Sequence, residues 1–264
     1  MISNSQIEER LIDVPGGTLF ARKWTPEHVR SKRPVILLHD SLGCVDLWRN
    51  FPNLLAQQLA APVIAYDRLG FGRSSRRDTL PTFEFIAEEA DLFFPEVHRA
   101  FVTDRFSLFG HSVGGAMALM IAASPGNDCC AVVTESAQAF VEQRTKSGIR
   151  TAKEQFKDAA QFDRLKRWHG DKAQWVLDAW TETWLSPEFA NWSLDPHLRR
   201  VQCPCLVIHG DSDQYGSEEF PRRIASGTQG PAKLSILKAC GHVPHREQPE
   251  KVLSLVTQFI SESC

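Results

Sequence analysis

Six short apolar runs, rich in β-branched and aromatic residues, recur along this chain and are separated by longer segments. Runs this short and apolar are typical of the buried strands of a parallel sheet, which helices cover on both faces. The runs are Val35–Leu38, Val63–Tyr66, Phe106–Phe109, Ala131–Thr134, Cys205–His209 and Leu234–Leu237. Two more strands, Arg10–Val14 and Leu19–Trp24, flank a Pro-Gly-Gly turn and should pair antiparallel. The sequence therefore predicts an α/β fold with an eight-stranded, mostly parallel sheet flanked by helices.

Helical periodicity occupies five segments between these strands, and we expect them to cover the sheet. They are Leu47–Leu59, Phe83–Ala100, Val113–Ala123, Glu218–Ala225 and Glu250–Ile260. The segment 136–198 differs, because it contains no convincing strand and holds five of the seven tryptophans. Two of them, Trp180 and Trp184, are one helical turn apart and would form an aromatic stripe on a helix. We predict a core domain of residues 1–135 and 199–264 with 136–198 as a helical cap. We expect most cap aromatics to seat the cap on the core and at least one to line an apolar pocket.

Composition excludes several classes of protein. The chain has 264 residues, of which 42% are hydrophobic and 23% charged, as in folded globular proteins. Its net charge of −2 is scattered along the chain, so we expect no nucleic acid partner. The longest apolar stretches, such as Ala116–Ala123, are far shorter than the ~20 residues of a membrane span. Residues Met1–Arg10 lack the pattern of a signal peptide. We expect a cytoplasmic protein that does not enter membranes, and a homodimer is possible.

The seven cysteines are an odd number, and their spacing fits neither a disulfide framework nor a zinc site. We therefore expect reduced, mostly buried thiols. No group of His, Cys or carboxylate residues has the spacing of metal ligands. The sequence predicts neither a metal nor a cofactor.

The segment Phe106–Gly115 carries the most informative motif. It reads F-S-L-F-G-H-S-V-G-G, in which an apolar strand runs into G-x-S-x-G and then into a helical segment. This is the pattern of a nucleophile elbow, a sharp strand-to-helix turn that holds the serine hydroxyl above the sheet. The motif nominates Ser112 as a nucleophile, with the amide of Val113 at the helix N-terminus ready to meet developing negative charge.

A serine hydroxyl needs a base and a group that orients the base. His242 follows a glycine in the loop after the last predicted strand, and His245 is its near competitor. Two acids, Asp211 and Asp213, follow the strand Cys205–His209, and either could reach the histidine. The order serine, acid, histidine along the chain is the one found on α/β-hydrolase sheets.

These motifs resemble those of the α/β-hydrolase superfamily over nearly the whole chain. The closing pattern G-H-x-P-x-x-E-x-P of that family stands at Gly241–Pro249, and D-x-x-G-x-G-x-S stands at Asp67–Ser74. The resemblance implies that the acid is Asp213 rather than Asp211. It also implies a structural role for the Asp67 loop, which would shape the entrance to the site.

The same resemblance places a second oxyanion-hole amide in the loop after Val35–Leu38. This loop reads H-D-S-L-G, where the family commonly has H-G-x-x-G, so Ser41 would supply the amide beside that of Val113. Asp40 departs from the pattern. A carboxylate facing the hole would oppose an oxyanion, so we expect Asp40 to point away or to pair with a cation. The run Asp40–Gly43 also resembles the N-S-L-G segment of 3-oxoadipate enol-lactonases.

The sequence thus predicts a serine hydrolase that cleaves a small to medium hydrophobic carboxylic ester with Ser112, His242 and Asp213. Its partners would be this acyl substrate and water. Several alternatives stay open: a lactone hydrolase, a carbon–carbon bond hydrolase with the same triad, and a hydrolase-like receptor with little turnover. Cofactor-independent perhydrolase or haloperoxidase activity would be a side reaction of the same acyl-enzyme. Dehalogenases and epoxide hydrolases of similar layout have an aspartate at the elbow, so Ser112 argues against them.

Overall fold

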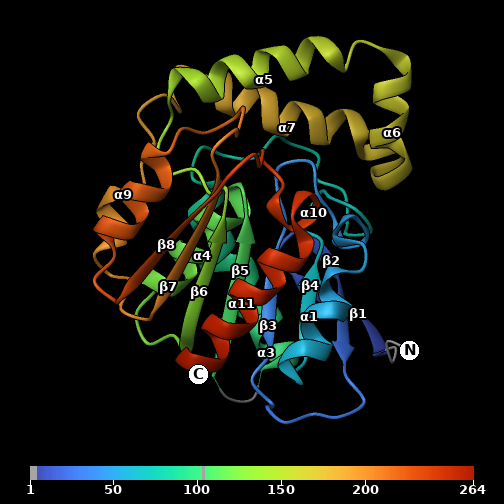
Figure 1. Cartoon of the computed structure of the whole chain (residues 1–264). Coiled ribbons are helices and arrows are strands. Elements are labelled where there is room, and N and C mark those ends of the chain that lie inside the picture. Colours follow the sequence, from blue (N-terminus) through green and yellow to red (C-terminus); the bar gives the residue numbers. More distant parts are fainter. Residues whose placement is uncertain (1–4, 103–104) are drawn as a thin grey trace.

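The structure, a computed structural model, describes residues 5–102 and 105–264. The described residues form an eight-stranded sheet between two layers of helices (Figure 1). The strand order is β1-β2-β4-β3-β5-β6-β7-β8, and only the β1–β2 and β2–β4 ladders are antiparallel. The predicted α/β fold with a mostly parallel sheet of eight strands is confirmed. The expectation that Met1–Arg10 is no signal peptide falls partly on residues 1–4, which lie outside the described residues.

The central strands are buried on both faces, as their uniformly apolar sequences require. Every residue of β3, β4, β5, β6 and β7 is buried. The strands are β1 (Gln6–Val14), β2 (Gly17–Thr25), β3 (Val35–Leu38), β4 (Val63–Tyr66), β5 (Phe106–His111), β6 (Cys129–Glu135), β7 (Cys205–Gly210) and β8 (Ala232–Leu237). All eight overlap the predicted ones.

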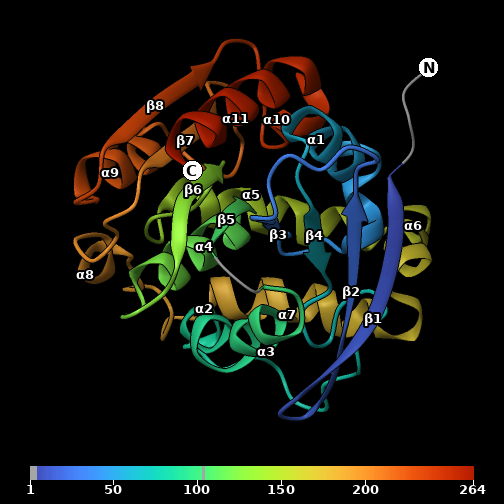
Figure 2. The ribbon, with the colours of Figure 1, turned by 90° about the horizontal axis from the view of Figure 1, so that it is seen from below.

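The helices of the two faces enclose separate apolar cores. On one face lie α1 (Phe51–Leu59) and α11 (Pro249–Ser263); on the other lie α2 (Phe85–Glu88), α3 (Phe94–Phe101), α4 (Val113–Ala123), α8 (Asp195–Leu198) and α9 (Glu219–Gly227) (Figure 2). Short α10 (Pro244–Glu247) precedes α11. The expected helix at 47–59 is interrupted, because Arg49 has a positive φ of 55° between the 3-10 helix η1 (Val45–Trp48) and α1. The expected helix at 83–100 contains a π-helical turn, η2 (Glu89–Phe93), at the buried carboxylate of Glu89.

Three helices lie across the carboxyl ends of the parallel strands (Figure 1). They are α5 (Gln143–Gln155), α6 (Ala159–His169) and α7 (Ala173–Leu185), with the short 3-10 helix η3 (Gly170–Lys172) before α7. We call them the α5–α7 layer. His169 ties this layer to the loops below, since its Nδ1 accepts the amide of Gly72 at 2.9 Å and its Nε2 lies 3.0 Å from the carbonyl of Leu42.

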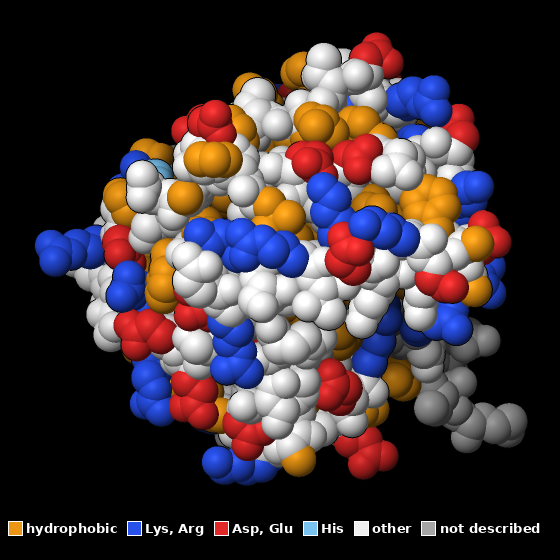
Figure 3. Space-filling model, turned by 90° about the horizontal axis from the view of Figure 1, so that it is seen from above, with side chains coloured by type: hydrophobic (Ala, Val, Ile, Leu, Met, Phe, Trp, Pro, Cys, Tyr) orange, Lys and Arg blue, Asp and Glu red, His pale blue; other side chains and the backbone are white. Residues whose placement is uncertain are grey.

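Trp175 packs the same layer against the loop that follows β4. Its ring lies so close to Gly70 that a Cβ atom at position 70 would come within 2.3 Å of it, and Gly70 has a φ of +94°. A glycine is therefore required here by both contact and conformation. The outer face of the molecule above this layer carries interspersed basic, acidic and apolar side chains (Figure 3).

One expectation about the cysteines is wrong. Cys130 in β6 and Cys264 at the end of α11 form a disulfide, with Cα atoms 5.8 Å apart. The other five cysteines are free, and four of them are buried. The pair escaped prediction because 134 positions separate the two residues, and only the packing of α11 on the sheet brings them together. No helix among the described residues has the length and apolar character needed to cross a membrane.

Candidate active site

The turn from β5 to α4 holds Ser112 in the strained geometry of a nucleophile elbow. Its φ of 57° and ψ of −125° lie outside the regions that most residues adopt. Two glycines allow the close passage of backbone. A Cβ at Gly110 would lie 2.2 Å from the carbonyl oxygen of Gly114, and one at Gly114 would lie 2.2 Å from that of Leu38. The amide of Ser112 donates to the carbonyl of Glu135 at 2.8 Å, which holds the elbow against β6.

The three side chains predicted as a triad meet above this elbow. The Oγ atom of Ser112 lies 3.0 Å from Nε2 of His242. Nδ1 of His242 lies 2.9 and 2.8 Å from the two carboxylate oxygens of Asp213. All three residues are buried. Because Nδ1–H donates to the carboxylate, the neutral imidazole presents the lone pair of Nε2 to the serine hydroxyl.

Electrostatics favour the charged forms of the histidine and its acid. Burial works to raise the pKa of Asp213, but the charge and hydrogen bond of His242 outweigh it and the pKa lies below its ordinary value. Burial works to lower the pKa of His242, but the charge of Asp213, its hydrogen bond and the charge of Asp40 raise the pKa above 6.5. This arrangement stabilises an imidazolium, the species formed when the histidine removes a proton.

The two competitors from the sequence lie elsewhere. Asp211 is hydrogen-bonded to the hydroxyl of Ser212 at 3.0 Å and lies 3.8 Å from the ammonium of Lys238. His245 is buried with its Nδ1 2.5 Å from the carboxylate of Glu135. Of the four candidates, the structure brings only His242 and Asp213 into line with Ser112.

The two amides expected to bind an oxyanion belong to Ser41 and Val113. Within the described part of the chain, no protein group accepts a hydrogen bond from the N–H of Ser41 or of Val113. Ser41 lines the same cavity as Ser112. Asp40 lines this cavity and also a second one beside His111 and Arg246. Among the described residues no cation forms a direct ion pair with its carboxylate, and the charge of Arg246 acts on it through space.

A cavity of about 250 Å³ opens at the Ser112 hydroxyl, beneath the α5–α7 layer. This volume is below the roughly 300–1,000 Å³ of typical small-molecule pockets. Its walls are apolar and aromatic on one side, with Ile149 of α5, Trp180 and Trp184 of α7, and Tyr215. The tryptophan pair that the sequence placed on one helical stripe therefore lines the cavity.

A family model described as "Alpha/beta hydrolase family" matches residues 35–255. The chain belongs to this family. The alpha/beta hydrolase is 24% identical over 295 residues to proline iminopeptidase of Heyndrickxia coagulans, which covers 96% of this chain and 98% of that protein. It is 40% identical over 105 residues to 1-acylglycerol-3-phosphate O-acyltransferase ABHD5 of Mus musculus. That second match spans 37% of this chain and only 28% of the relative.

Solved structures share the fold of this alpha/beta hydrolase. The crystal structure of carboxylesterase CesB from Bacillus subtilis superposes with a TM-score of 0.73 at 19% identity, over 98% of this chain and 93% of that one. At this identity the likeness establishes the architecture alone.

Sequence reasoning missed Gln138. Gln138 is buried in the loop after β6, and its Nε2 donates a hydrogen bond to Oγ of Ser112 at 3.1 Å. A single glutamine in a loop forms no recognisable sequence motif, so only the tertiary structure shows that it lies beside the nucleophile. Its amide adds a second polar contact that orients the serine hydroxyl.

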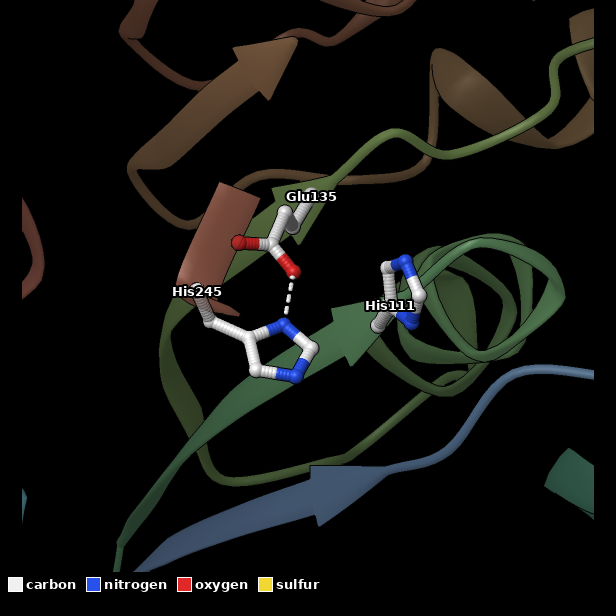
Figure 4. A group of neighbouring side chains, drawn as sticks. All are labelled: His111, Glu135 and His245. Carbon is white, nitrogen blue, oxygen red and sulfur yellow. Dashed lines mark hydrogen bonds and ion pairs between the residues drawn. The ribbon is translucent and has the colours of Figure 1, made fainter. Parts of the chain in front are cut away.

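Within the described part of this alpha/beta hydrolase, one group of side chains has ligand atoms near enough to hold a metal ion: His111, Glu135 and His245, with those atoms within 4.8 Å of one another (Figure 4). Each of the three side chains already has a hydrogen-bond partner within the protein. Nδ1 of His245 is hydrogen-bonded to the carboxylate of Glu135, and Nε2 of His111 lies 2.8 Å from the carbonyl oxygen of His242. One oxygen of Glu135, Oε1, is buried without a hydrogen-bond partner. We name this group the His-Glu-His cluster.

The Asp67 loop of the alpha/beta hydrolase is held by its own carboxylate. Asp67 accepts the amides of Val45 at 2.6 Å and Arg73 at 2.7 Å, and a Cβ at Gly72 would lie 2.1 Å from its Oδ2. Burial raises the pKa of Asp67 to about 6. Asp67 does not line the cavity, and its contacts are those of a residue that shapes the loop.

Proposed function

We propose that this protein is a serine hydrolase that cleaves small carboxylic esters through an acyl-enzyme. The observation that carries this proposal is the alignment of Ser112 Oγ, 3.0 Å from His242 Nε2, with an imidazole whose Nδ1 contacts Asp213. A serine within reach of an oriented base is the arrangement of nucleophilic acyl transfer. The free amides of Ser41 and Val113 beside it would bind the tetrahedral oxyanion.

The reaction would proceed in two halves. His242 Nε2 takes the hydroxyl proton as Ser112 Oγ bonds to the carbonyl carbon, and the imidazolium is stabilised by Asp213. His242 then gives this proton to the leaving oxygen, which departs as an alcohol and leaves the acyl group on Ser112. Water enters, His242 removes one of its protons, and the new C–O bond displaces the serine oxygen. The proton on His242 returns to Ser112, and the carboxylic acid is released.

The cavity supports a small acyl compound with apolar character. A volume of about 250 Å³ and walls from Trp180 and Trp184 suit a short acyl chain or a compact ring rather than a long lipid. We propose that residues 136–198 act as the cap that selects this substrate, because the α5–α7 layer supplies these walls.

Other acceptors and bonds can use the same residues. Lactones and carbon–carbon bonds next to a carbonyl remain alternatives, as does a receptor with little turnover. The relative ABHD5 is named an O-acyltransferase, which suggests one more alternative: transfer of the acyl group to an alcohol instead of to water. All but the receptor share the acyl-enzyme on Ser112.

The test combines labelling with turnover. The purified protein is treated with a fluorophosphonate probe and assayed with 4-nitrophenyl acetate and butyrate, with and without glycerol as an alternative acceptor. We expect labelling, steady turnover, and loss of both in Ser112→Ala. Labelling without steady turnover would favour the receptor. Turnover within tenfold of wild type in the alanine variant would exclude the mechanism, since a triad member is worth several orders of magnitude.

A further inference from the structure

Asp40 lines the cavity in which Ser112 and His242 lie, at a position where this family commonly has glycine. We propose that Asp40 makes the cavity selective for esters that carry a positive charge, such as primary amine or quaternary ammonium esters. This inference rests on the proposed ester hydrolysis and names the substrate class of the same site.

Three hydrogen bonds hold the main chain at Asp40, and its side chain packs against Gly43. Its carbonyl oxygen accepts hydrogen bonds from Nδ1 of His39 at 2.8 Å, from the guanidinium of Arg68 at 2.9 Å and from the amide of Gly43 at 3.2 Å. The carboxylate rests on Gly43, where a Cβ atom would come within 2.0 Å of Oδ1. The guanidinium of Arg68 binds the carbonyl, and among the described residues no hydrogen bond or ion pair joins it to the carboxylate, although the charge of Asp40 acts on Arg68 through space.

The charge of Asp40 therefore lacks a direct partner in the described residues. Its pKa lies below the ordinary value, because positive charge on His111, His39 and Arg246 outweighs the effect of burial. At neutral pH those two histidines are uncharged, since burial lowers the pKa of His111 to about 4 and that of His39 well below 6.5. Arg246 donates its guanidinium to the carbonyl of Leu47 instead. The surrounding charges stabilise this carboxylate only through space, so a cation in the cavity would add the direct ion pair that the described residues do not supply.

An anion in this place penalises the reaction of a neutral ester. Formation of the oxyanion beside Ser41 and Val113 creates a second negative charge near Asp40, and like charges repel strongly where water is scarce. A cation on the substrate removes this penalty, because it pairs with Asp40 before the oxyanion forms. The same carboxylate disfavours substrates that carry their own carboxylate, and these include anionic lactones.

The aromatic residues that line the cavity fit a cation as well. Trp180, Trp184 and Tyr215 line the cavity, and the rings of Trp180 and Tyr215 lie 5.8 Å apart at 67°. Aromatic faces attract ammonium groups, most strongly quaternary ones. An acidic side chain and aromatic walls around one cavity are the chemistry that recognises alkylammonium groups.

Isosteric substrates test this selectivity on both sides of the ester. Butyrylcholine is compared with 3,3-dimethylbutyl butyrate, in which carbon replaces the charged nitrogen. The 4-nitrophenyl ester of 3-aminopropanoate is compared with that of butanoate, after correction for spontaneous hydrolysis. We expect kcat/KM of the cationic member of at least one pair to exceed that of its neutral partner roughly tenfold or more. In Asp40→Asn this ratio should fall severalfold, and the preference that remains would come from the aromatic walls.

The ratio of kcat/KM between the cationic and the neutral member of a pair is used because an effect that changes both values equally, such as a changed pKa of His242, cancels in it. Asp211→Asn is the matched control, because it deletes one negative charge at the same edge of the sheet outside the cavity, and it should keep the wild-type ratio. Calorimetric binding of butyrylcholine to Ser112→Ala, with and without Asp40→Asn, gives a readout independent of turnover. The melting temperature of Asp40→Asn shows whether the variant keeps the wild-type fold.

Two results would overturn the selectivity while the proposed function stands. In one, neutral esters are hydrolysed and neither cationic member is preferred. In the other, the preference exists but Asp40→Asn leaves both the ratio and the binding affinity unchanged. If Ser112 is unlabelled and neutral esters are not hydrolysed either, the proposed function fails and this inference fails with it.

Discussion

Nε2 of His111 lies 2.8 Å from the main-chain carbonyl oxygen of His242, across 131 positions of sequence. His111 directly precedes Ser112, so this contact ties the elbow that carries the nucleophile to the loop that carries the base. Because burial lowers the pKa of His111 to about 4, its ring is neutral at pH 7 and donates this hydrogen bond through Nε2–H.

Loss of this bond should loosen the loop of His242. We expect His111→Phe to lower kcat by up to about 100-fold, the effect of a misplacement near 1 Å, with little change in KM. His111→Gln retains an N–H donor and should recover part of the loss. Steady-state kinetics on 4-nitrophenyl butyrate measure both parameters. His28→Ala, at an exposed histidine, serves as the control; equal kcat in all variants would remove His111 from a positioning role.

Substitution of the two acids after β7, Asp211 and Asp213, should affect kcat very differently. Asp213→Asn removes the carboxylate that holds Nδ1–H of His242, and we expect kcat to fall by about 10⁴-fold because the imidazole adopts the wrong tautomer. Asp211→Asn should retain kcat within about twofold, because its side chain lies outside the cavity, where it is hydrogen-bonded to Ser212 and lies near Lys238. A larger loss in Asp211→Asn than in Asp213→Asn would reverse the assignment.

Activity should increase with pH as His242 loses its proton. Its folded-state pKa lies above 6.5, so the midpoint of the acid limb of kcat/KM should lie above that value. Asp40→Asn removes a negative charge that favours the imidazolium, and it should move this midpoint to lower pH. Profiles measured from pH 5 to 9 on a neutral ester test both statements. A flat profile over this range would contradict the role of His242 as base.

The buried pair of Glu135 and His245 should contribute to stability. Glu135→Gln removes the charge 2.5 Å from His245 and should lower the free energy of unfolding by about 3–5 kcal/mol. The pKa of Glu135 lies below 4.5 in the folded protein, because the charge and hydrogen bond of His245 outweigh burial. Its contribution is therefore complete above pH 4.5 and is lost as the pH falls through the folded-state pKa.

Urea denaturation at pH 7 and at acid pH measures this effect. The double variant with His245→Gln should lose less than the sum of the single losses, because the two residues are in contact. Additive losses would show that the pair does not interact.

The disulfide should stabilise the attachment of the last helix. Cys264→Ser opens a loop of 134 positions and should lower the free energy of unfolding by about 2–5 kcal/mol. Mass spectrometry of alkylated protein with and without reductant reports the bond directly. If all seven cysteines are alkylated without reduction, the bond is absent from the protein in solution.

The sequence alone determined the strands, the elbow and the order of the candidate residues. These are local properties: four consecutive apolar, β-branched or leucine residues at Val35–Leu38 favour a buried strand, and the close backbone approach at positions 110 and 114 requires glycine. The family resemblance preferred Asp213 to Asp211, and the tertiary structure shows why, since only Asp213 contacts His242.

Other features depend on elements that are distant in sequence, so tertiary packing alone decided them. Gln138 beside Ser112, the bond between His111 and His242, and the disulfide of Cys130 each join segments whose distance no local pattern encodes. The environment of Asp40 is the sharpest case. Its departure from the family pattern was visible in the sequence, but whether its charge is paired depends on the directions taken by Arg68 and Arg246, and these follow from packing.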